Sequence, residues 1–152
     1  GAGVLYAYRE SLTGGKTSRE HAAGVRAAAQ GENFQGGWGG AQSETQWRMD
    51  WADAGVMLLP PPVADVEVGI DRVIGLWRTR RLFVFDTLSR LRDELGTYSR
   101  KMGDDGQPTE QIDSKQEFHL LDALRYVVLG LTAPTAPEEV VVYEDRVYVS
   151  TF

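Results

Sequence analysis

The stretch FHLLDALRYVVLGL, at positions 118–131, is the most apolar part of this 152-residue chain. Together with the residues from position 115 it predicts a long helix that packs inside the fold. Asp122 breaks this apolar pattern. Burying an ionised carboxylate is costly unless the charge is paired or coordinates a metal ion. The negative charge of Asp122 therefore needs a compensating partner, which is either a basic side chain or a metal ion.

Two structural explanations for Asp122 follow from the spacing. Arg125 lies at i+3, where it would form an ion pair on one helix face. His119 lies at i−3, so Asp122 would alternatively belong to a wetter stripe of the helix. Spacing alone favours the structural ion pair with Arg125 over a functional role.

The rest of the chain alternates between strand and helix patterns. Strands are predicted at 4–8, 56–59 and 82–85, and helices at 18–29, 43–54, 65–77 and from 86 or 87 to 95. Ser18, Ser43 and Asp65 are the expected N-caps. Hairpins are predicted at 97–112 and 140–151, with a stiff connector at 133–137. This order predicts an α/β class, with a central mixed sheet flanked by helices and added hairpins.

The amino-acid composition limits the classes of function that the chain can have. The chain has 42% apolar residues, which is typical of a folded globular domain. It has no cysteine, which excludes disulfides, thiolate zinc sites and a cysteine nucleophile. The net charge of −6 argues against a large basic surface that binds nucleic acid by charge alone. No stretch has the length and apolar character of a membrane span.

A phosphate-binding loop is suggested by Gly14-Gly15-Lys16-Thr17, but its spacing is wrong. The pattern G-x-x-x-x-G-K-[ST] needs a glycine at position 10, where the chain has Glu10. The sequence therefore predicts no ATPase motor within these residues.

The residues on both sides of Asp122, taken together, favour a functional role for it. The stretch IDSKQEFHLLDALRY, at 112–126, resembles the last active-site helix of the nuclease domain in viral terminase large subunits, proteins that cut and package double-stranded DNA. The resemblance extends through 39–48, 65–70, 82–85 and 94–98. It implies a ribonuclease H-like nuclease domain over 1–132, followed by the connector and hairpin at 133–152. The implied activity is endonucleolytic cleavage of concatemeric double-stranded DNA.

The resemblance also implies a two-metal site that binds Mg²⁺ or Mn²⁺ through oxygen ligands. Asp122 and Glu44 are the expected catalytic carboxylates and metal ligands, and Asp113 and His119 are the expected auxiliary residues. The alternatives are that Glu44 only favours the helix dipole, Asp113 caps a turn and His119 packs. The family's first carboxylate, on an opening strand, has no counterpart here. We therefore expect the chain to begin after that strand and to cleave weakly or not at all by itself.

Five basic side chains, three at a predicted helix end and two beside the predicted hairpin turn, are candidates for DNA contact. They are Arg78, Arg80, Arg81, Arg100 and Lys101. The first three would otherwise complement a helix dipole, and the last two would otherwise lie in a solvated loop. The tryptophans are expected to pack in the core and not to stack on bases. They are Trp38, Trp47, Trp51 and Trp77.

The partners implied by the resemblance are viral double-stranded DNA, the ATPase domain of a full-length subunit, the portal and the small terminase subunit. The implied location is the host cytoplasm, transiently at the procapsid portal. Two other interpretations stay open. One is a catalytically incomplete nuclease-fold module that guides or docks DNA, and the other is a resolvase or integrase relative.

Overall fold

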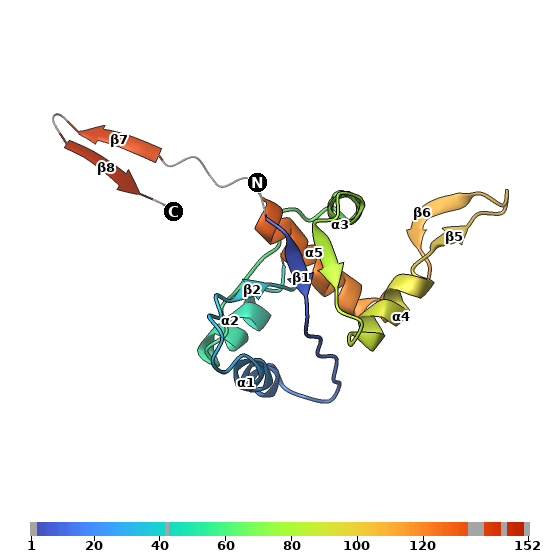
Figure 1. The fold of residues 1–152 in the computed structure, drawn as a ribbon, viewed down its shortest axis with the longest axis horizontal. Coiled ribbons are helices and arrows are strands. Elements are labelled where there is room, and N and C mark those ends of the chain that lie inside the picture. The colour runs from blue at the N-terminus through green and yellow to red at the C-terminus, as the bar shows by residue number, and fades with distance from the viewer. Residues whose placement is uncertain (1–2, 42, 134–138, 144–145, 151–152) are drawn as a thin grey trace.

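A computed structural model of the chain describes residues 3–41, 43–133, 139–143 and 146–150. Helices and strands alternate through most of this length (Figure 1). The helices are α1 (Ser18–Ala28), α2 (Thr45–Asp53), α3 (Val66–Arg78), α4 (Ser89–Thr97), the 3₁₀ turn η1 (Lys115–Glu117) and α5 (His119–Thr132). The strands are β1 (Leu5–Ala7), β2 (Gly37–Trp38), β3 (Leu58–Leu59), β4 (Leu82–Val84), β5 (Arg100–Met102), β6 (Pro108–Ile112), β7 (Glu139–Tyr143) and β8 (Arg146–Ser150).

The strands of the described residues pair two by two, so the predicted central mixed sheet is wrong for this part of the chain. β1 pairs with β4 and β2 with β3, both in parallel, whereas β5–β6 and β7–β8 are antiparallel hairpins. Strands of two or three residues make few ladder hydrogen bonds, and such pairs need a packed helix for stability. Here α5 provides that support, because it contacts β2 and packs against β1 and β4.

The core lies where α3 and α5 meet the β1–β4 pair. Leu76 of α3, Leu82 of β4 and Val128 of α5 are buried together. Leu5, Val73 and Leu124 pack around them. The apolar helix predicted from the sequence is therefore confirmed as the element on which the fold is built, and Figure 1 shows it behind β1 and β4.

Several helix starts differ from the prediction. Thr17 caps α1 in place of Ser18, because its hydroxyl oxygen accepts the Glu20 N–H while the Glu20 carboxylate accepts the Thr17 N–H. Glu44 is at the N-cap of α2 in place of Ser43. The expected cap Asp65 is confirmed, since its carboxylate accepts two N–H groups of the first turn of α3. The helix α4 begins only at Ser89, and 115–117 form the turn η1 before α5.

Both predicted hairpins are confirmed. The turn residues 144–145 of the second one, and all but the first residue of the connector 133–137, lie outside the described residues. The prediction that Trp77 packs in the core is wrong, because its side chain is exposed. The buried stripe of α3 runs through Gly69, Val73 and Leu76, and Trp77 lies beside it. None of the described helices has the length and apolar character that a membrane span needs.

Candidate functional site

A cleft of about 720 Å³ separates residues 36–40, which we call the glycine-rich segment, and α2 from the first turns of α5. Glu44 lines it from the start of α2, and His119 and Asp122 line it from the start of α5. Aromatic rings form much of the remaining wall, from Trp38, Trp47, Trp51 and Tyr126. The structure thus brings three of the four sequence-predicted acidic and histidine candidates to one cleft.

Asp122 occupies the first turn of α5 and has the partner that its spacing predicted. The Arg125 guanidinium donates to Asp122 Oδ1 at 3.0 Å. The Arg125 side chain is 7% exposed, whereas that of Asp122 is 35% exposed. The ion pair is therefore real, but it does not bury the carboxylate. Asp122 is both a structural partner of Arg125 and part of the cleft wall.

Arg125 is buried because α3 has a glycine where the arginine stem crosses it. A Cβ at Gly69 would lie 2.5 Å from Arg125 Cγ and 2.6 Å from Cδ. The guanidinium also lies 4.6 Å from the centre of the Tyr126 ring, a cation–π distance. The position of the Asp122 partner is thus set by α3 as well as by α5.

The contact between Gly69 and the Arg125 side chain should contribute to stability. We expect Gly69→Ala to destabilise the fold by about 1–2 kcal/mol, because overpacking costs roughly 1–3 kcal/mol and alanine returns up to about 1 kcal/mol of helix propensity. The matched control is Gly75→Ala in the same helix, where a Cβ would meet nothing within 4 Å. Urea unfolding of both variants measures the difference, and equal stabilities would contradict the packing argument.

The charge of Asp122 also reaches Tyr98, which follows α4. Burial raises the pKa of Tyr98, and the negative charge of Asp122 raises it further. The Tyr98 ring packs edge-on against Phe118, with centroids 4.9 Å apart. The site therefore adjoins the base of the β5–β6 hairpin.

Glu44 does not cap α2 with its side chain. Its Oε2 accepts the Ala41 N–H at 2.7 Å, which closes the turn that leads into the helix. Gly40 has φ +73°, a backbone conformation that favours glycine, and a Cβ there would crowd Glu44 Oε2 at 2.8 Å and Trp47 Cε3 at 3.2 Å. The glycine backbone thus lets the carboxylate lie against the loop at the edge of the cleft.

The two auxiliary candidates differ in position. His119 is exposed and lines the cleft. Asp113 is exposed as well, but it follows β6, where its N–H donates to the Ser99 carbonyl, and it is not among the cleft residues. The structure therefore places Asp113 at the hairpin base, outside the lining of the cleft.

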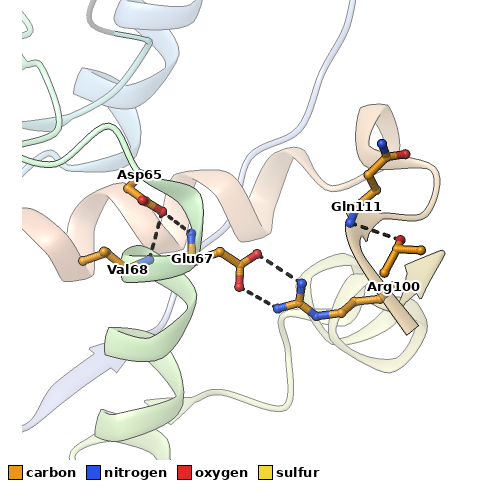
Figure 2. Close-up of polar contacts among 6 residues, drawn as sticks. Asp65, Glu67, Val68, Arg100 and Gln111 are labelled. Carbon is orange, nitrogen blue, oxygen red and sulfur yellow. Dashed lines mark hydrogen bonds and ion pairs between the residues drawn. The ribbon is translucent and has the colours of Figure 1, made fainter. Parts of the chain in front are cut away.

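The basic candidates fall into two groups at opposite ends of α3. Arg100 forms a two-point ion pair with Glu67, at 2.6 and 3.2 Å, which joins the β5–β6 hairpin to the first turn of α3 (Figure 2). Lys101 follows it and is exposed. Arg78, Arg80 and Arg81 lie at the other end of α3, about 16 Å further along its axis at a rise of about 1.5 Å per residue. That second group lies far from the Asp122 end of the cleft.

The cleft offers carboxylate oxygens and an imidazole as possible metal ligands. Carboxylate oxygens suit Mg²⁺ and Mn²⁺. Within the described residues, however, no three His, Cys, Asp or Glu side chains lie close enough together to hold an ion. Asp122 also shares one oxygen with Arg125, and Glu44 shares one with Ala41. The described residues thus supply oxygen donors without a complete metal site.

One residue that supports the site was missed by sequence reasoning. Glu94 of α4 is buried, and its carboxylate accepts the N–H groups of Leu120 and Leu121 at 3.2 and 2.9 Å. It thereby caps the helix that carries His119 and Asp122. The available signal was the lack of a capping side chain before α5, since Phe118 occupies its N-cap. Such a helix start needs an acceptor from elsewhere.

A second prediction follows from this cap. We expect Glu94→Ala to destabilise the fold by about 1–3 kcal/mol, because two helix N–H groups lose a charged acceptor. The exposed neighbour Asp93→Ala serves as the control. Denaturant unfolding gives the free energies, and amide exchange of Leu120 and Leu121 reports the local opening. Unchanged exchange at both amides would show that Glu94 is not their cap.

The chain is similar to one protein of known structure. No protein-family profile and no curated protein matches the chain. Among solved structures, the nuclease domain of the P22 large terminase superposes with a TM-score of 0.59 and 26% sequence identity. The match covers 81% of this chain and 65% of that domain, so the chain spans slightly less than two thirds of its relative. The resemblance predicted from the sequence is thereby confirmed in three dimensions: the chain is similar to the nuclease domain of a viral large terminase.

Proposed function

We propose that this chain is the nuclease part of a viral DNA-packaging terminase and that it cleaves double-stranded DNA at the cleft between α2 and α5. The proposal is supported by the lining of one cleft, which includes Asp122, Glu44 and His119, in a chain similar to the P22 nuclease domain. Cleavage of a phosphodiester needs groups that bind the phosphate and activate water. The three side chains are suited to that chemistry.

Electrostatics supports a requirement for cations. Two carboxylates at the cleft repel a phosphodiester, so DNA approaches them only if positive charge lies between. Mg²⁺ or Mn²⁺ would supply that charge and a nucleophilic water, as in two-metal nucleases. We propose Asp122 and Glu44 as the oxygen ligands that this part of the chain contributes. His119 is proposed as an auxiliary group at the rim.

The ribonuclease H-like fold, the domain boundary at 132 and the partners belong to the same proposal. The partners are viral DNA, an ATPase motor domain, the portal and the small subunit, with action in the host cytoplasm and at the procapsid. Arg100 and Lys101, at the hairpin near the Asp122 end of α5, are the proposed DNA contacts of the cleft.

The proposal is tested by plasmid nicking with Mn²⁺, Mg²⁺ or EDTA. The protein is assayed as its gene encodes it. We expect nicking that requires Mn²⁺ or Mg²⁺ and is absent in EDTA. No ion-dependent cleavage by the encoded protein would contradict the nuclease assignment.

A second candidate is a DNA-guiding module without catalysis. The incomplete donor set of the described residues favours it. It predicts that the encoded protein binds duplex DNA with the same affinity in EDTA and in Mn²⁺ and releases no product. The same plasmid assay, read together with a binding titration, separates the two candidates.

A further inference from the structure

The two faces of the β1–β4 pair differ in chemistry. One face carries the aliphatic residues Leu5, Ala7, Leu82 and Val84, which alternate along the strands with the residues of the other face. Leu5 and Leu82 pack into the core beside α5. The opposite face carries Tyr6 and Tyr8 from β1 and its continuation, and Phe83 and Phe85 from β4 and its continuation. We call these four residues the aromatic face. One side of the pair is thus aliphatic and buried, and the other is aromatic.

The aromatic face is open to solvent in the described part of the chain. Tyr6 is 59% exposed, Phe83 44% and Phe85 47%. The Tyr6 and Phe83 rings are stacked at 5.5 Å, and the Tyr6 and Phe85 rings meet edge-on at 6.4 Å. The rings of Tyr6, Phe83 and Phe85 therefore form one continuous surface, and the Tyr8 hydroxyl beside them donates to Glu32 Oε2. Figure 1 shows this side of the pair turned away from α5.

Positive charge borders the aromatic face at the start of the strands. From position 72 to position 85 the chain carries four arginines and no acidic residue, although its net charge is −6. Alternation along β4 puts Arg81 on the same face as Phe83. Its guanidinium donates to the Gly3 carbonyl, just before β1. Arg78 and Arg80, both exposed, lie beside it. The positive charge is confined to this end of the face, because Asp86 follows Phe85 at the other end and Glu32 accepts the Tyr8 hydroxyl there.

We infer that the aromatic face and its arginine border bind unpaired nucleotides of single-stranded DNA. Aromatic side chains stack on bases of any sequence, and neighbouring arginines contact the backbone phosphates. A helix-covered face of a parallel sheet is instead rich in Val, Ile and Leu, as the inner face is here. Paired bases in a duplex are not available for stacking, so the surface favours single strands.

This inference concerns a surface different from the cleft and does not rest on nuclease activity. The cleft is lined by α2, α5 and the glycine-rich segment, whereas the aromatic face lies on β1 and β4. It also gives the Arg78, Arg80 and Arg81 group a role of its own, at the end of α3 away from Asp122.

The test is a fluorescence anisotropy titration of a labelled oligothymidylate and of a duplex of equal length, both in EDTA so that no cleavage occurs. We expect tighter binding of the single strand. Tyr6→Leu with Phe83→Leu keeps apolar side chains in place and should weaken single-strand binding by at least about tenfold. Arg78→Gln with Arg81→Gln should reduce the slope of log affinity against log salt by about 1.4. Arg19→Gln, on the exposed side of α1, is the control and should change neither quantity.

A second measurement uses the unaltered chain, so it does not depend on variants that fold. An oligonucleotide carrying 5-iododeoxyuridine is crosslinked by light, and the labelled peptides are mapped. Crosslinks at positions 4–8 or 81–85 are expected. Crosslinks elsewhere, or equal affinity for duplex and single strand, would overturn the inference. A concentration-dependent dimer that the leucine variants abolish, with no DNA affinity, would overturn it too, because the face would then bind protein. None of these outcomes depends on whether the cleft cuts DNA.

Discussion

Asp122→Asn is expected to lower ion-dependent DNA cleavage by the encoded protein by about a hundredfold or more. A carboxylate that holds a catalytic cation contributes several kcal/mol to the transition state, and each 1.4 kcal/mol or so is a factor of about ten in rate. Asparagine has nearly the same shape, and its carbonyl oxygen still accepts the Arg125 N–H that Asp122 accepts now. The change therefore removes the charge while keeping the local geometry.

Stability must be measured beside the rate, because Asp122 is also the partner of Arg125. Losing the charge leaves a buried guanidinium with a weaker acceptor. We expect a cost of about 1–2 kcal/mol, below the value for a fully buried pair because the carboxylate is partly exposed. Nicking is therefore compared at temperatures where both proteins are folded by circular dichroism.

Asp71→Asn is the matched control for this experiment. Asp71 is an exposed carboxylate on α3 outside the cleft, so changing it to an amide should leave the cleavage rate unchanged. A comparable loss in both variants would show that the cleft does not define the site. An Asp122→Asn protein that cuts at the unaltered rate would remove Asp122 from catalysis altogether.

The dual role of Asp122 shows what local spacing predicts well. A carboxylate and an arginine three residues apart on a helix meet whenever the helix forms, so the ion pair followed from the sequence. The two interpretations of Asp122, as an ion-pair partner and as a site residue, do not exclude each other. In the structure Asp122 pairs with Arg125 and also lines the cleft.

Contacts between distant segments were beyond the reach of local patterns. Arg125 is buried because of Gly69, and α5 is capped by Glu94, neither of which is near in sequence. Trp77 fitted the apolar period of α3, but the stripe that meets α5 is centred on Val73 and Leu76. The predicted central sheet failed for a similar reason. Strand patterns locate candidate strands along the chain, whereas the pairing of the strands depends on which helix supports them.

Gly130→Ala is expected to have the largest effect on stability, a loss of about 3 kcal/mol. A Cβ at Gly130 would lie 2.1 Å from Cδ2 and Cε2 of Trp38. The indole is rigid and belongs to β2, so it cannot bend away as the end of a long side chain does. Overpacking of this kind costs roughly 1–3 kcal/mol, occasionally more, and exceeds the alanine gain in helix propensity of up to about 1 kcal/mol.

The same substitution should also change the cleft, because Trp38 lines it and β2 carries the glycine-rich wall. Moving the indole away from α5 shifts the wall that faces Asp122, so DNA cleavage should fall even where the protein remains folded. Gly24→Ala in α1, where a Cβ would meet nothing within 4 Å, is the control and should be neutral or slightly stabilising. Guanidinium unfolding gives the free energies, and tryptophan fluorescence reports the indole. If Gly130→Ala were as stable as Gly24→Ala, with unchanged fluorescence, Trp38 would not pack on α5, and the cleft would lack the wall on which the proposed function depends.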